Sequence, residues 1–361
     1  MKLSEYLLNL DVADLRAIAG RYACDCNRHS KLDLVQTIHY EMLDSGNYER
    51  LFATLDREIF YVMTYLLFQP KAWFSLEELM GKGTLIQKLL DLKGSPKTWI
   101  ARLVHSGWLF PVSTKFHIQY EIPEDFRPFL QQQFIRAWQR AFDLPDAEPA
   151  RLTVRDEERS LLHDLKTWLH FVAEKRPPLT KEGVLHKRFQ HQLMKKLRVA
   201  EQLVEGRPWR FGYGRRFPFY PNRFAFIYDF SYDRGWIREE PGGLDITEAG
   251  HAKLTDPSLL FRVQQKDCFH YWLKTYGKPL PTLPFLVHWM NAVLLQQWIS
   301  TDKLYNAISP WISSYYYDDV PTIFRERIIQ MLLHLGLIQI GVHAQSERHY
   351  VRKKAGNFFG E

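Results

Sequence analysis

The 361-residue sequence contains few cysteines, and its glycine and proline contents are modest. Three cysteines cannot close a disulfide framework, which favours a reducing compartment, and we expect a cytoplasmic protein. The 19 glycines and 19 prolines exclude collagen-like and low-complexity chains. The first residues lack the basic and apolar regions of a signal peptide. These absences favour an ordinary globular protein with buried cores.

One stretch, residues 279–301, carries no formal charge and is long enough to cross a bilayer. It contains three prolines and polar side chains that are costly in hydrocarbon, among them His288, Asn291 and Gln296. The composition therefore predicts a buried helix in a helical domain, and we expect no membrane partner.

The motifs of common enzyme classes are also missing. The sequence has no G-x-x-x-x-G-K-[ST], H-E-x-x-H or G-x-S-x-G, and Gly81-Lys82-Gly83-Thr84 has P-loop residue types at the wrong spacing. The adjacent acids Asp156-Glu157-Glu158 cannot all point at one metal ion. Cys24-x-Cys26-x-x-His29 contains residue types that bind zinc, but no second pair of ligands follows to complete the four that a structural zinc site needs. We therefore expect no catalysis, cofactor or metal; an unrecognised metal-dependent nuclease remains an alternative.

The positive charge is concentrated in one segment, residues 187–223. The whole chain has a formal net charge of +7, whereas these 37 residues alone carry +8. Aromatic side chains, including Trp209 and Tyr213, alternate with the cations. Cations neutralise phosphates and flat rings stack on bases, so the segment predicts nucleic-acid binding. The alternative is a solvated basic helix over 185–205 followed by an aromatic loop that packs on its own domain. The ten basic residues are Lys187, Arg188, Lys195, Lys196, Arg198, Arg207, Arg210, Arg215, Arg216 and Arg223.

The N-terminal 48 residues predict a small helical module. Asp11 and Ser30 are good N-caps, each followed by an apolar stripe of helical spacing. The patterns Leu-x-Val-x-x-Leu-Arg and Ser-Lys-x-x-Leu-Val resemble the SAP and Rho N-terminal type of nucleic-acid-binding motif. The resemblance implies phosphate contacts by Arg16, Arg28 and Lys31; a helical hairpin that docks proteins is the alternative.

A pattern of helix, glycine and β-hairpin occurs three times, over 99–110, 226–237 and 328–338, each followed by strand-like residues. Glycine suits the left-handed position that ends a helix. Upstream of the first copy, Ser75-x-x-Glu78 forms a capping box and Ser95-Pro96 starts a third helix. We therefore predict a mainly α (α+β) protein of tandem winged helices with short hairpin wings. The expected parts are 1–48, 50–145, 150–257 and 258–361.

The third helix of a winged helix usually enters the DNA major groove. In the first copy we expect Lys97, Thr98, Arg102 and His105 to face outward. In the last copy the expected outward residues are Arg325, Gln330 and His334, and the wing carries Arg348, Arg352, Lys353 and Lys354. We expect these wing cations and Arg325 to bind nucleic acid.

Residues 150–355 resemble the helicase-associated regions of bacterial proteins related to the XPB group of helicases. The likeness rests on Thr247-Glu-Ala-Gly250, Leu254-Thr-Asp-Pro257 and Trp272-Leu273, followed by the last helix–hairpin pattern. These residues also resemble, less closely, the winged-helix subunit that partners that helicase in transcription factor TFIIH. The resemblance implies a non-catalytic DNA-associated factor, with RNA also open, that works with a helicase, nuclease or polymerase. A protein-docking scaffold is the alternative.

Overall fold

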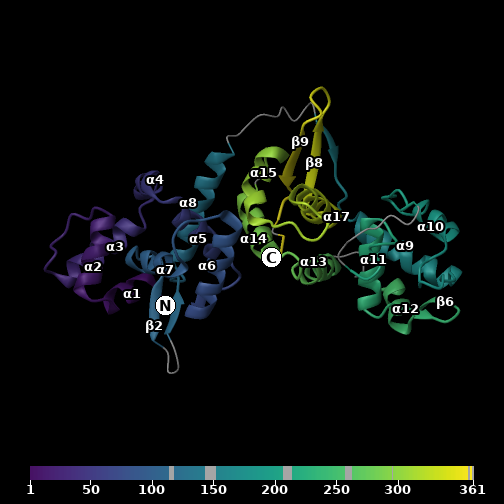
Figure 1. Cartoon of the computed structure of the whole chain (residues 1–361), viewed down its shortest axis with the longest axis horizontal. Coiled ribbons are helices and arrows are strands. Elements are labelled where there is room, and N and C mark those ends of the chain that lie inside the picture. The colour runs from purple at the N-terminus through teal and green to yellow at the C-terminus, as the bar shows by residue number, and fades with distance from the viewer. Residues whose placement is uncertain are drawn as a thin grey trace. The chain divides into compact units, whose positions relative to one another are not determined.

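A computed structural model describes the chain apart from residues 114–117, 143–151, 206–213, 257–261, 295, 357 and 360–361. The fold is mainly α-helical, and its strands form small antiparallel sheets, which confirms the predicted class (Figure 1). The chain divides into two compact units. The first contains Met1–Leu144 and Pro284–Val293, and the second contains Pro145–Leu283 and Leu294–Glu361.

The first unit starts with three helices, α1 (Leu3–Asn9), α2 (Val12–Arg21) and α3 (Lys31–Met42). Most of α14 (Leu283–Val293) also belongs to it. Its other elements are α4 (Ser45–Thr54), α5 (Arg57–Leu67), β1 (Trp73–Ser75), α6 (Leu76–Leu90), α7 (Pro96–His105), β2 (Phe110–Ser113), β3 (Ile118–Glu121) and α8 (Phe126–Ala141).

The N-terminal helices begin where the sequence predicts. The Asp11 side chain accepts from the Asp14 amide at 2.8 Å, and Ser30 Oγ accepts from the Asp33 amide at 3.3 Å. These helices share a core with the elements that follow them, because the buried Trp108 donates its Nε1 hydrogen to the Tyr22 hydroxyl at 2.8 Å.

The sheet of the first unit has the order β1-β3-β2. Phe74 of β1 pairs with Tyr120 of β3, so the strand before α6 joins the second strand of the hairpin. The predicted capping box closes the start of α6, and Ser95 caps α7 ahead of the N-terminal proline. The element order over residues 57–121 is therefore helix, strand, two helices and hairpin.

The second unit contains the remaining elements. Its first part has β4 (Leu152–Arg155), α9 (Ser160–Lys175), α10 (Lys187–Met194), α11 (Asn222–Asp233), β5 (Ile237–Glu240), β6 (Gly243–Ile246) and α12 (Glu248–Thr255). Its second part has α13 (Arg262–Tyr276), β7 (Ile299–Ser300), α15 (Thr301–Ile308), the 3-10 turn η3 (Ser309–Trp311), α16 (Val320–Thr322), the π-helix η4 (Ile323–Ile329), α17 (Gln330–His334), β8 (Ile338–His343) and β9 (His349–Lys353).

The pairing seen in the first unit recurs twice in the second. Ile299 of β7 pairs with Val351 of β9, the second hairpin strand. In the α9–β6 region, the Leu244 amide of β6 donates to the carbonyl of Pro177, which follows α9, at 2.9 Å. In each copy the segment just before α6, α10 or α15 is thus hydrogen-bonded to the second hairpin strand.

The three predicted glycines occupy the left-handed backbone region. Gly107, Gly235 and Gly336 have φ of 70°, 64° and 69°, which confirms the expected change of direction from helix to hairpin. At Gly336 a Cβ atom would also overlap the carbonyl oxygen of Glu158. Glycine is therefore required there by both conformation and space.

Two predicted helices differ from expectation. The basic helix that the alternative interpretation placed over 185–205 ends at Met194, because the buried Asp164 carboxylate accepts the backbone amides of Arg198 (2.7 Å) and Val199 (3.3 Å). The final helix, expected over 321–335, contains the π-helical turn η4, within which Arg327 is buried against Asp318.

The uncharged stretch forms a short buried helix, as predicted. In α14 the side chains of Leu286, Val287 and Trp289 are buried. Across the part of the chain that the structure describes, no helix is long and apolar enough to cross a membrane.

Replacing Gly336 by alanine should lower the free energy of unfolding of the second unit by about 2 kcal/mol, because the new Cβ meets Glu158 in a strained backbone conformation. Gly81→Ala is the control: the site lies within α6 with open space around it, and the change should raise stability by about 0.5–1 kcal/mol. Urea unfolding measures the free energy of unfolding of both variants. Equal values for the two variants would show that Gly336 is not required by conformation and space.

Candidate nucleic-acid interface

A buried charge network joins three helices of the second unit. Arg223, at the start of α11, has no exposed surface. Its Nη1 atom donates to Asp164 of α9 at 2.5 Å, and its Nε lies 3.4 Å from Glu157 Oε2. The sequence assigns Arg223 to nucleic acid, but in this structure its charge is neutralised in the interior because two carboxylates surround it.

His334 completes this network and is buried, which corrects the expectation that it faces outward. Its Nδ1 lies 2.7 Å from Glu157 Oε2, and its Nε2 lies 3.2 Å from the Gln330 amide nitrogen. A carboxylate accepts and an amide nitrogen donates, so the proton is on Nδ1. Burial lowers the pKa of His334 and keeps the ring neutral.

Glu157 remains ionised within the network. Burial opposes its ionisation, but the hydrogen bond from His334 and the charges of Arg223 and Arg155 lower its pKa to about 2. The last turn of α17 is thereby tied, through Glu157 and Arg223, to the first turn of α11.

Two further predicted cations, Arg215 and Arg216, are held by acids of their own domain. Arg216 is 8% exposed and donates to Glu239 at 2.6 Å, while Arg215 donates to the other oxygen of Glu239 at 2.9 Å. The backbone amides of both arginines donate to Asp229, whose pKa is raised to about 6 by burial. The predicted residues Arg207, Trp209, Arg210 and Tyr213 lie outside the described residues.

The remaining cations of the segment gather on the outer face of α10 and the turn after it. We call the exposed side chains of Lys187, Arg188, Lys195, Lys196 and Arg198 the α10 cationic face. Arg188 stacks over the Phe189 ring at 4.6 Å. Lys196 makes a long exposed contact, 3.5 Å, with Glu174 and lies 5.8 Å from the centre of the Phe171 ring. Among the described residues, the acids that neutralise the neighbouring arginines leave most of this face without an ion pair.

The three predicted groove-reading helices differ in exposure. On α7, Lys97, Thr98, Arg102 and His105 are exposed as predicted, and Arg102 is ion-paired with Asp56. Helix α11 is buried from Arg223 to Ser231, and α13 covers it by packing Tyr271 on Phe226 and Phe230. On the last copy Arg325 is exposed and Gln330 is half-buried.

Three of the four predicted wing cations have partners within the second unit. Arg348 is exposed at the β8–β9 turn. Arg352 donates to Gln339 at 2.5 Å and lies over the Trp298 ring, and burial lowers the pKa of Lys353. Lys354 contacts both oxygens of the Asp156 carboxylate at 2.9 and 3.0 Å.

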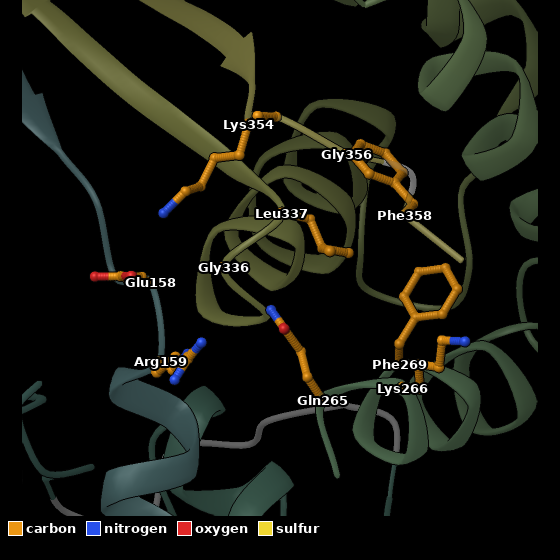
Figure 2. Close-up of a pocket in the computed structure, with 11 residues that line it drawn as sticks. Glu158, Arg159, Gln265, Lys266, Phe269, Gly336, Leu337, Lys354, Gly356 and Phe358 are labelled. Atoms are coloured by element: carbon orange, nitrogen blue, oxygen red, sulfur yellow. The ribbon is translucent and has the colours of Figure 1, made fainter. Parts of the chain in front are cut away.

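A small pocket lies beside that last ion pair. Figure 2 shows Lys354 and Glu158 on one side of it and the rings of Phe269 and Phe358 on the other. Its volume of about 140 Å³ is below the roughly 300–1,000 Å³ usual for small-molecule sites. The described residues contain no group of three or more His, Cys, Asp or Glu placed to hold a metal ion. Cys24 is buried, which raises the pKa of its thiol to about 11.

No protein-family model matches the chain, and no curated sequence matches it. The candidate site therefore rests on the geometry alone, and the part of it that remains exposed is the α10 cationic face.

The buried network predicts an acid-dependent loss of stability. Folding lowers the pKa of Glu157 from about 4.5 to about 2, so its contribution is complete above pH 4.5 and is lost as the pH falls toward 2. Glu157→Gln should lower the free energy of unfolding at pH 7 by about 3 kcal/mol and remove this part of the pH dependence. Glu158→Gln, at the exposed neighbouring residue, should change neither the free energy of unfolding at pH 7 nor its pH dependence.

Denaturant titrations between pH 2 and 7 measure the difference between each variant and the wild type. A Glu157→Gln protein with the wild-type pH profile would show that the network does not carry this stability.

Proposed function

We propose that the chain is a non-catalytic DNA-binding protein that holds the duplex through the α10 cationic face of its second unit. The observation that carries the proposal is the segregation of charge. Acids at 157, 164, 229 and 239 neutralise the inner arginines, whereas five exposed cations remain on one short helix and the turn after it. Such a cluster attracts phosphates and releases their counterions.

We further propose that the three copies are winged helices. Support comes from the order of helix, strand, two helices and hairpin in the first copy, and from helices that lead into a hairpin in the other two. In each copy the segment ahead of these helices is hydrogen-bonded to the second hairpin strand. The resemblance to helicase-associated regions supports an accessory role beside a helicase or nuclease.

The middle copy departs from the usual use of this fold. A third helix reads bases only when its outer face is free, and α11 is covered by α13. The α10 cationic face instead consists of lysine and arginine, which contact phosphates without reading sequence. We therefore expect strong salt dependence and little sequence preference.

A second candidate function, protein docking, is favoured by an apolar surface on the N-terminal helices. Tyr40 on α3 is 72% exposed, and Leu43, just after α3, is 36% exposed. A groove of about 650 Å³ lies along α3 beside Ser4 of α1. Exposed apolar side chains that line a groove are typical of protein-binding surfaces. A partner that stays bound after nuclease treatment, and after neutralisation of α10, would favour this function.

The DNA-binding proposal predicts the effect of removing charge from α10. With a fluorescently labelled blunt duplex, Lys195→Gln combined with Arg198→Gln should weaken binding by roughly tenfold and lower the slope of log affinity against log salt by about two, because two phosphate contacts are lost. The loss should be the same for unrelated duplex sequences.

The matched control is Lys88→Gln combined with Arg136→Gln, which removes the same charge from exposed positions of the first unit. Anisotropy titrations at about 50 and 200 mM salt compare the three proteins. The proposal would be wrong if the wild type showed no detectable DNA binding, or if both double variants lost the same amount of DNA affinity.

A further inference from the structure

A cavity of about 520 Å³ opens beside the α10 cationic face, within the second unit. Its size lies in the range of roughly 300–1,000 Å³ that small-molecule sites occupy. Most of its wall is apolar, and α10 contributes Lys187 and Gln190. The apolar lining consists of Val184, Leu185, Val204, Pro218 and Phe219.

Gln190, which lines this cavity, carries a buried hydrogen-bond acceptor that has no partner among the described residues. The side chain is 1% exposed, and its Nε2 donates to the Leu185 carbonyl at 2.7 Å. Since a carbonyl only accepts, the amide nitrogen must face Leu185 and Oε1 must be the other atom. Among the described residues Oε1 has no hydrogen-bond partner. A buried acceptor without a donor is costly, so a ligand that brings one is favoured.

The walls of the cavity are fixed before any ligand arrives. The Leu185 amide donates to the buried Tyr220 hydroxyl at 2.8 Å, and Thr180 and Val184 close a turn through a 2.7 Å backbone bond. Phe219 stands in a turn that its own amide closes by donating to the Arg216 carbonyl at 3.1 Å. Because Arg216 is itself anchored by Glu239, the aromatic wall rests on a buried ion pair. Such preorganisation lowers the entropy cost of binding.

An exposed ring and a cation border the same opening. Phe219 is 39% exposed, which is unusual for a phenylalanine in a packed turn. The Lys187 ammonium donates to the Val204 carbonyl, so it stands at the rim. Lys187 and His186 also line an adjoining hollow of about 390 Å³, together with Arg188. The cavity thus adjoins the α10 cationic face directly.

We propose that this cavity receives one unpaired nucleobase of a single-stranded DNA end or junction whose duplex part lies on the α10 cationic face. The base stacks on Phe219 and donates a hydrogen bond from its Watson–Crick edge to Gln190 Oε1, and its phosphate contacts Lys187. This inference rests on the proposed function and names the kind of DNA that the site prefers. Stacking on one aromatic ring supplies about 1–3 kcal/mol per base, which corresponds to roughly fivefold or more in affinity.

One acid, Glu182, is also among the residues that line the cavity. Its carboxylate repels phosphate, whereas the adjoining hollow is lined by Lys187 and Arg188 without an acid. The phosphate is therefore expected on the Arg188 side, and the base on the side of Gln190 and Phe219.

The test compares a blunt hairpin duplex with the same duplex carrying a three-nucleotide single-stranded overhang. We expect the wild type to bind the overhang about tenfold more tightly. Phe219→Ala should abolish this preference while leaving blunt-duplex affinity unchanged. Gln190→Met, which keeps the volume but removes the acceptor, should reduce the preference. An overhang with abasic nucleotides should bind like the blunt duplex.

A spectroscopic readout separates base capture from a general loss of affinity. A 2-aminopurine in the overhang should brighten on binding the wild type, because it leaves its stacked neighbours, and should not brighten with Phe219→Ala. Tyr232→Ala, another exposed ring of the same unit, is the control and should behave as wild type.

The two proposals fail in different ways. The nucleobase site is wrong if the wild type binds the blunt duplex and the overhang duplex equally, or if Phe219→Ala weakens the binding of both DNAs to the same extent. In either case the proposed binding of duplex DNA to the α10 cationic face is unaffected. If neither DNA binds, both are wrong.

Discussion

The second unit depends on one buried interaction, the pairing of Arg223 with Asp164 and Glu157. These three charges lie almost entirely out of water, so each is tolerated only because the others are present. The pair fixes α11 against α9, and His334 extends it to α17. Asp164 also holds the amides of residues 198 and 199, which ends the basic stretch after α10. The geometry of the exposed cations is therefore set from the interior.

The same arrangement sorts the positive charge into two groups. Arginines near the acids become structural, and Arg216 with Glu239 supports the turn that displays Phe219. Lysines and arginines on α10 and the turn after it stay at the surface, next to a cavity lined by Gln190, whose acceptor has no partner among the described residues. A single segment thus supplies both the frame of the proposed site and its binding surface.

Local signals were sufficient to predict much of the fold. The caps at Asp11, Ser75 and Ser95, and the left-handed glycines, depend on neighbouring residues only and are confirmed. Contacts between distant residues were not accessible from one sequence. Asp164 lies 59 positions before Arg223, and nothing in the local pattern marks their pairing. The burial of His334 and the orphan acceptor of Gln190 have the same origin, because both arise only when separate elements pack.

In the proposed function DNA lies on α10, whereas α11 belongs to the core of the second unit. Hydrogen exchange of the intact chain with and without a blunt duplex tests it most directly. DNA should slow exchange only at residues 187–198 and leave the amides of α11 unchanged. Protection of α7 or α11 without protection of 187–198 would contradict it.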